Sequence, residues 1–268
     1  MALPVGNPTD GSLYLKGICT GETRSDPCVV VFNYGDILRL KGGFYADFVF
    51  NRHMAIYRAR HDGADIDTVS LRSNAAYVAM NFFDWADFFG IVGATHITLT
   101  TDGSSFSRHS SLISLDFKTQ MCWGVGTKVT LWKMGDFSVG VEGQYFRTMP
   151  HLNSMVRLAT GDINYFNFKN IFTYDEWQVG LGASYRYHWE CTSMVPYIAI
   201  KRARGEMVFD DFAFAFNSVD YTLESLKSKK LWGYAVGMSM ILSQMIGVTV
   251  EGRFADEKAL YINGQLRF

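Results

Sequence analysis

The chain has 268 residues, enough for one large domain or two small ones, so composition has to decide between them. Only 19% of the residues are charged and 15% are aromatic, yet mean hydropathy is +0.02 because glycine, serine, threonine and asparagine dilute the apolar residues. This differs from a soluble protein, which concentrates apolar residues in a core and charge on its surface. The net charge of −1 gives no nucleic-acid footprint.

The first part of the chain, residues 1–30, is expected to be an N-terminal segment that leads into the folded domain. Met1 opens the chain without the basic and apolar regions of a signal peptide, so we expect it to replace a removed signal sequence. Cys19 and Cys28 flank a short polar stretch and are the better candidates for a disulfide. Cys122 lies in the middle of a predicted strand, where a buried or free thiol explains it as well as a disulfide does.

Residues 31–268 are predicted to form β-strands of a single domain, because apolar side chains recur at every second position. From Trp177 to Trp189 one set of alternate positions is apolar or aromatic, and the other is polar or glycine. This segment of about a dozen residues exceeds the ~5–6 residues of a typical soluble strand and suits the ~9–11 residues of a tilted membrane crossing. The same alternation occurs at 38–50, 123–131, 137–145 and 260–268.

Residues 231–250 carry no charge and on hydropathy alone are a candidate transmembrane helix. Their small and polar residues nevertheless fall at every second position, and Ser243-Gln244 interrupts the run as a turn would. The pattern therefore favours a β-hairpin over a helix.

Short turns are expected at 51–52, 84–85, 135–136, 191–192 and 243–244, and longer polar connections at 59–73, 101–118, 149–172 and 205–229. Short turns at one end and long loops at the other are typical of outer-membrane barrels. The predicted fold is an all-β, transmembrane, antiparallel up-and-down β-barrel of about 12 strands, with 14 to 16 as the alternative.

The predicted inward face carries charges of both signs, and we interpret these residues as candidates to line a pore. An alternative is that they pair across strands and only fill the interior. Because isolated charges in a dry core are very costly, charges of both signs favour a wet interior and weak ion selectivity. The candidates are Arg39, Lys41, Asp47, Lys128, Glu142, Arg186, Glu251, Arg253 and Arg267.

The remaining candidate residues are aromatic side chains, histidines and one possible hydrolase motif. Aromatic residues near strand ends are candidates for the girdles at the membrane interfaces, namely Trp123, Tyr145, Trp177 and Trp189. The six histidines show no metal-ligand spacing, and we predict no metal, no cofactor and no catalytic residue. Ser107-Arg108-His109 is the only local hint of a hydrolase, and it is weak because adjacent strand residues point to opposite faces.

The order and spacing of several short motifs resemble those of the chlamydial major outer membrane proteins. They are Leu3-Pro4-Val5-Gly6-Asn7-Pro8, Asp26-Pro27-Cys28, the segments 43–50 and 175–180, Val195-Pro196-Tyr197-Ile198, Lys227-Ser228-Lys229-Lys230 and Gly264-Gln265-Leu266-Arg267-Phe268. The resemblance runs through most of the chain, although the four long connections look shorter than the variable segments of the family.

The resemblance implies a homotrimeric general porin of the bacterial outer membrane, which is also a surface antigen and a structural part of a disulfide-linked envelope. Its partners would be membrane lipid, small solutes and ions, and other cysteine-containing envelope proteins, but no nucleic acid. Cys28 matches a family cysteine best, whereas Met134 stands where the family tends to have one.

Three functions compete on this basis. A passive, weakly selective diffusion channel is favoured. A barrel that only anchors a structural or adhesive protein is the alternative, and a lipase-type enzyme of the outer membrane is the weakest of the three.

Overall fold

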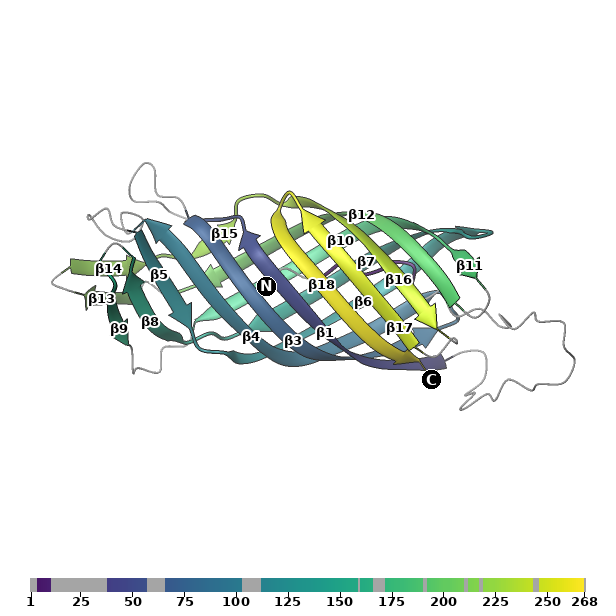
Figure 1. Ribbon diagram of the computed structural model, residues 1–268, viewed down its shortest axis with the longest axis horizontal. Coiled ribbons are helices and arrows are strands. Elements are labelled where there is room, and N and C mark those ends of the chain that lie inside the picture. The colour runs from purple at the N-terminus through teal and green to yellow at the C-terminus, as the bar shows by residue number, and fades with distance from the viewer. Residues whose placement is uncertain are drawn as a thin grey trace, which may run out of the picture.

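The computed structural model describes residues 4–10, 38–56, 66–102, 112–158, 160–165, 172–189, 192–209, 212–216, 219–242 and 246–267. Within these ranges, no helix is long and apolar enough to cross a membrane. The structure is a cylinder of strands that are tilted relative to its long axis (Figure 1).

Ten strands form a closed wall in which each strand pairs antiparallel with the next along the chain, and the last pairs with the first. They are β1 (Leu38–Arg52), β3 (Ile66–Phe82), β4 (Ala86–Asp102), β6 (Gln120–Met134), β7 (Phe137–Thr148), β10 (Thr173–Tyr185), β12 (Thr192–Val208), β16 (Trp232–Leu242), β17 (Ile246–Phe254) and β18 (Glu257–Arg267). The up-and-down barrel is confirmed.

Further strands extend this wall. Six join the same sheet, which makes sixteen strands in the described part of the chain: β2 (Met54–Ile56), β5 (Leu112–Phe117), β8 (Leu152–Arg157), β9 (Asp162–Tyr165), β11 (Tyr187–Trp189) and β15 (Leu226–Ser228). β13 (Phe212–Phe216) and β14 (Val219–Leu223) form a separate hairpin. The prediction of about 12 strands, or 14 to 16, thus compares with ten in the closed wall and sixteen in the sheet.

The wall is apolar outside and largely polar inside. Phe44, Ile198 and Val78 are 75%, 63% and 61% exposed, whereas Lys41, Glu251 and Arg253 are at most 1% exposed. On β18 buried and exposed residues alternate without interruption. This arrangement suits a barrel whose outer face meets lipid, because apolar side chains there need no polar partner.

The two ends of the barrel differ, as predicted. Turns at 83–85 and 135–136 join strands at one end, hereafter the short-turn end, where the C-terminus also lies (Figure 1). Strands β5, β8, β9, β13 and β14 lie beyond the wall at the other end, hereafter the long-connection end (Figure 1). The predicted hairpin in 231–250 is confirmed as β16 and β17.

Some predicted boundaries are wrong. β3 starts at Ile66, inside the loop expected at 59–73, and β12 continues to Val208, inside the loop expected at 205–229. The turn expected at 51–52 is the end of β1, which carries a β-bulge between Val49 and Asn51. The extra residue of a bulge interrupts the two-residue alternation, so the pattern looked like a strand end. Positions 191 and 243–244 lie outside the described residues.

The interior near the long-connection end is an aromatic core. Phe117 stacks on Phe209 with ring centroids 6.2 Å apart, and Phe172 contacts both rings edge-on, at 6.1 and 5.1 Å. All three side chains are buried. The inward face therefore changes along the barrel from polar to apolar. On β6, Cys122 is a buried free thiol, whereas Cys19 and Cys28 lie outside the described residues.

Candidate functional site

The N-terminal segment 4–10 lies inside the barrel, where every one of its residues is buried. The backbone N–H of Val5 donates to Glu251 Oε1 at 3.0 Å, and Gln144 Nε2 donates to the carbonyl of Pro4 at 2.5 Å. Further along the segment, the hydroxyls of Thr9 and Ser184 lie 2.6 Å apart. The segment therefore contacts side chains from β17, β7 and β10, and it narrows the interior.

Glycines on the wall make room for this segment. A Cβ at Gly140 would lie 2.5 Å from the Pro8 carbonyl oxygen, and a Cβ at Gly182 would lie 2.6 Å from Pro8 Cγ. Both glycines are inward positions of the alternating strands β7 and β10. Any larger residue there would collide with the segment.

One charged cluster holds the end of the segment. Lys41 Nζ lies 2.9 Å from Asp10 Oδ2 and 2.6 Å from Asp87 Oδ2. Arg267 Nη2 lies 2.7 Å from Asp10 Oδ1, and Asn81 donates to Asp87 at 2.7 Å. Because Asp10 is held by two cations from β1 and β18, this cluster ties the N-terminal segment to the seam where the barrel closes.

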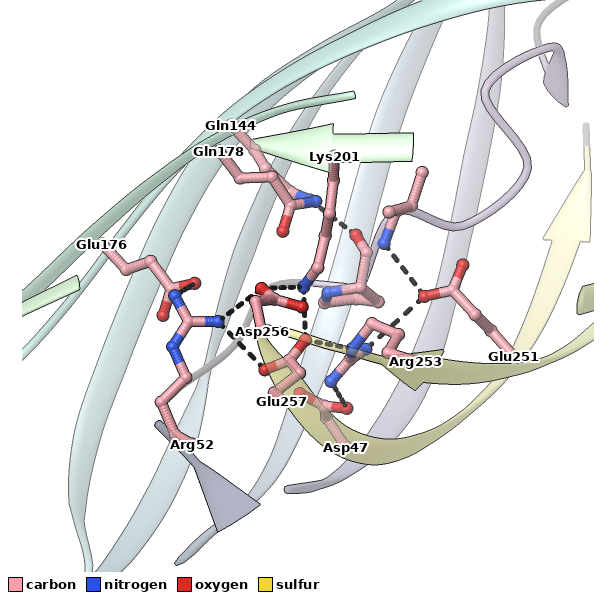
Figure 2. A network of polar contacts seen from close by, with 12 residues as sticks. Asp47, Arg52, Gln144, Glu176, Gln178, Lys201, Glu251, Arg253, Asp256 and Glu257 are labelled. Carbon is pink, nitrogen blue, oxygen red and sulfur yellow. Dashed lines mark hydrogen bonds and ion pairs between the residues drawn. The ribbon is translucent and has the colours of Figure 1, made fainter. Parts of the chain in front are cut away.

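A second charged cluster crosses the barrel toward the long-connection end (Figure 2). Arg253 contacts Asp47 at 2.6 Å and Glu257 at 2.7 Å. Lys201 pairs with Glu257 and lies 3.2 Å from Asp256. All of these side chains are fully buried.

Arg52 extends the second cluster to the opposite wall. Its guanidinium lies 3.0 Å from Glu176 and from Asp256, and 3.1 Å from Glu257. Glu176 in turn accepts a hydrogen bond of 2.6 Å from the hydroxyl of Tyr174. Strands far apart in sequence are thereby joined across the interior, as Figure 2 shows.

A third group lies between these clusters, on β6, β7 and β10. Glu142 accepts hydrogen bonds from Gln178 and, at 3.3 Å, from Gln144. Lys128 is directly opposite Glu142 in the β6–β7 register and is 9% exposed. The amides and the carboxylate form a polar layer around the N-terminal segment.

The structure places the predicted pore-lining residues as follows. Eight are buried on the inward face: Lys41, Asp47, Lys128, Glu142, Arg186, Glu251, Arg253 and Arg267. The ninth, Arg39, is partly exposed and pairs with Asp84 at 3.2 Å. Four of the eight belong to the two clusters, namely Lys41, Arg267, Asp47 and Arg253, and Lys128 and Glu142 belong to the third group. Glu251 binds Val5 and Tyr197, and Arg186 lies at the short-turn end.

Several interior charges were missed. Lys201 continues the inward positions Tyr197 and Ala199 on β12, so the alternation could have found it. Asp87 follows the same rule on β4, two residues before the buried Phe89. Arg52 could not be found this way, because the bulge in β1 shifts its side chain inward.

The predicted girdle residues face outward at two levels. Trp123 and Tyr145 contact each other with centroids 5.7 Å apart, and Trp177 is the cross-strand partner of Tyr145. Trp189, at the end of β11 toward the short-turn end of the barrel, is 69% exposed. At ~3.3 Å per residue and a tilt near 40°, Trp177 and Trp189 are about 30 Å apart along the axis. This separation suits a membrane, and the girdle role stays a prediction.

His53 is a titratable group outside the spanning strands, and its pKa is shifted. His53 lies between β1 and β2. Burial has the largest effect and lowers the pKa of His53, and the charges of Lys230, Lys258 and Lys229 lower it further. Within the described ranges, no group of three or more histidine, cysteine or acidic side chains could hold a metal ion. Ser107-Arg108-His109 lies outside those ranges.

Comparison with known proteins shows which proteins this barrel is similar to. The family model described as "Chlamydia major outer membrane protein" matches residues 1–62 and 211–268, which include the N-terminal segment and strands β1 and β16–β18. The major outer membrane porin, serovar H, of Chlamydia trachomatis is 24% identical, over 100% of this chain and 95% of that protein. The chain is related to the chlamydial major outer membrane porins.

A second porin gives a similar match. The major outer membrane porin of Chlamydia pneumoniae is 24% identical over 100% of this chain and 94% of that protein. The serovar H alignment spans 380 positions, more than the 268 residues here, so parts of that porin have no counterpart in this chain. Among solved structures, the β-domain of the Bordetella autotransporter Brka has a TM-score of 0.45 and 10% identity, covering 85% of this chain and 98% of that domain. The named porin relatives and the closed barrel itself show that the chain is a β-barrel of the bacterial outer membrane.

Proposed function

We propose that the protein is an outer-membrane channel for ions and small polar solutes, with an interior path narrowed by residues 4–10. The main support for this proposal is a set of buried polar atoms that form no hydrogen bond with any described residue. Among them are Asp47 Oδ2, Gln178 Oε1, Asn263 Oδ1 and Gln265 Oε1. Each costs about 1–3 kcal/mol unless it is hydrogen-bonded. Water in a hydrated interior would supply the missing partner.

The proposed channel is weakly selective. Seven cationic and eight anionic side chains are buried in the described residues, so neither sign dominates the interior. Most of them are neutralised locally by ion pairs of 2.6–3.2 Å. A passing ion would therefore meet alternating signs of charge rather than a ring of one sign.

A salt gradient across a planar bilayer tests this proposal. The wild-type channel is expected to show a small reversal potential, because its interior charges nearly balance. Arg186→Glu reverses one interior charge and should shift the reversal potential toward cation preference. The matched variant Arg204→Glu makes the same change on the exposed outer face of β12 and should leave it unchanged. Equal shifts of the reversal potential in both variants would show that the interior charges do not set the ion preference.

A second function, a structural or adhesive barrel that does not conduct, is favoured by one observation. The aromatic core of Phe117, Phe172 and Phe209 fills the interior near the long-connection end. An anchor needs only such a packed interior. The relatives are named porins, and we therefore keep the channel as the main proposal and propose no enzymatic activity.

Assembly is also proposed from the resemblance rather than from contacts. A homotrimer would place the outer faces of neighbouring barrels together, and the shallow depression lined by Ala46, Ala76 and Gly264 offers small residues for such packing. Native mass measurement in detergent tests it, with a monomer as the contrary result. Envelope cross-links would fall to Cys19 and Cys28 rather than to the buried Cys122.

A further inference from the structure

The outer face of the barrel changes from apolar to cationic at the long-connection end. On β12 the exposed residues Ile198 and Ile200 are followed by exposed Arg202 and Arg204. On the neighbouring strand the first outward residue is the exposed Trp232, preceded in the chain by the exposed Lys229 and Lys230. The change therefore occurs at the same level on adjacent strands, because Arg202 and Trp232 are register partners.

Four cations at this level form one patch, hereafter the basic patch: Arg202, Lys229, Lys230 and Lys258. The Arg202 guanidinium lies over the Trp232 ring at 5.9 Å. The N–H of Lys229 donates to the carbonyl of His53 at 2.9 Å. Lys230, Lys258 and Lys229 all lie close enough to His53 to lower its pKa, after the effect of burial.

The acidic side chains nearby are already used. Asp256 and Glu257 are next to Lys258 in sequence, but they point inside and pair with Arg52 and Lys201. On β12, Glu206 pairs with Lys227 at 3.2 Å. Lys230 and Lys258 form no ion pair with any residue that the structure describes. The patch thus presents positive charge outward.

The position of the basic patch points to a membrane ligand. The aromatic side chains of Trp232, Tyr234 and Phe254 are each more than half exposed just below it, as expected at a membrane interface. Lipid acyl chains lie against the apolar face, so lipid headgroups meet the barrel at the level of these cations. Cations at such a level attract anionic headgroups.

We propose that the basic patch binds the phosphate of an anionic membrane lipid, with the acyl chains lying on the apolar face of β12 and β16. Arg202 is oriented by Trp232 and supplies a planar set of donors for phosphate oxygens. Lys230 and Lys258 supply charge. Because long connections face the exterior in outer-membrane barrels, the lipid belongs to the outer leaflet.

Native mass spectrometry of the full chain in a neutral detergent tests the proposal. The probes are short-chain phosphatidic acid, phosphatidylcholine of the same chain length, and inorganic phosphate. The patch variant is Lys230→Gln/Lys258→Gln, and the matched variant Lys118→Gln/Lys133→Gln removes two lysines from the β5–β6 region. Heat-modifiable migration on gels checks that each variant is folded.

Wild type should retain phosphatidic acid more tightly than phosphatidylcholine. Each cation near an anionic headgroup is worth about fivefold in affinity, so the patch variant should bind phosphatidic acid about 25-fold more weakly. The matched variant should bind it as wild type does.

Three results would overturn the proposal: no preference for phosphatidic acid, equal loss in both folded variants, or displacement by inorganic phosphate at the concentration of the lipid. The last would indicate a simple anion site. None of these measurements depends on conduction, so the lipid site and the channel are tested independently of each other.

Discussion

At the scale of single residues, the interior charges are held by each other rather than by water alone. Arg253 contacts Asp47 and Glu257 at 2.6 and 2.7 Å with all three side chains buried. A buried ion pair is often no better than a well-packed apolar pair, but removing one partner leaves an uncompensated charge. The importance of Arg253 therefore lies in what its loss would expose.

Arg253→Met should destabilise the barrel by about 3–5 kcal/mol, because the buried Asp47 loses the cation that pairs with it, whereas Glu257 keeps Lys201 and Arg52. Thermal unfolding in detergent, followed by circular dichroism, measures the change. Arg204→Met removes an exposed cation from the outer face and should cost less than about 1 kcal/mol. If the two variants unfold alike, the second cluster is not a stabilising network.

His53 reports on the basic patch. Burial and the neighbouring lysines hold its pKa below the ordinary value, so the ring is neutral at pH 7. Lys230→Gln/Lys258→Gln removes two of the positive neighbours and should raise the pKa toward its ordinary value, but only partly, since burial remains. Histidine NMR signals followed through a pH titration measure it. An unchanged pKa would mean that the lysines lie farther away than the structure places them.

At the scale of elements, the sequence is informative where alternation is unbroken. The hairpin of β16 and β17 and the long strand β10 follow directly from apolar residues at every second position. The bulge at Val49/Asn51 breaks that rule and hides Arg52. The position of residues 4–10 could not be predicted, because nothing in a short segment without periodicity says whether it lies outside or inside a barrel.

The inward glycines were a partial signal for that segment. Gly140 and Gly182 fall on the polar face of their strands, and this alternation is visible in the sequence. A glycine facing a lumen can mean open space or close approach of another backbone. Only the contacts with Pro8 in the structure show that these two glycines allow close approach of another backbone.

A designed disulfide tests the position of the segment. In a chain whose native cysteines are replaced by serine, Thr9→Cys/Ser184→Cys should cross-link readily, because the two native hydroxyls lie 2.6 Å apart. Mass spectrometry of the oxidised protein measures the bond. Thr9→Cys/Ser239→Cys is the control, since the Ser239 hydroxyl bonds to Thr249 instead. Equal cross-linking of both pairs would contradict a fixed segment.

At the scale of the whole molecule, a ten-stranded wall encloses three layers. From the short-turn end these are the Asp10 cluster with the N-terminal segment, the charged network around Arg253, and the aromatic core. Small barrels leave little free space once inward side chains are placed. A channel of this size should therefore conduct weakly and should respond to the segment that narrows it.

Loosening the N-terminal segment should increase conductance. Asp10→Asn removes the charge that Lys41 and Arg267 bind at 2.9 and 2.7 Å, so the segment loses its attachment near the barrel seam. Larger or more frequent openings than in wild type are predicted. Asp67→Asn changes an exposed carboxylate at the start of β3 and should behave as wild type does.

Single-channel recording of the refolded wild-type protein in a planar bilayer shows directly whether the barrel is a channel. We expect small stepwise openings with a low reversal potential in a salt gradient, and larger steps for Asp10→Asn. A folded, heat-modifiable barrel that never conducts, in wild type or in Asp10→Asn, would contradict the channel and leave the anchor as the function of this protein.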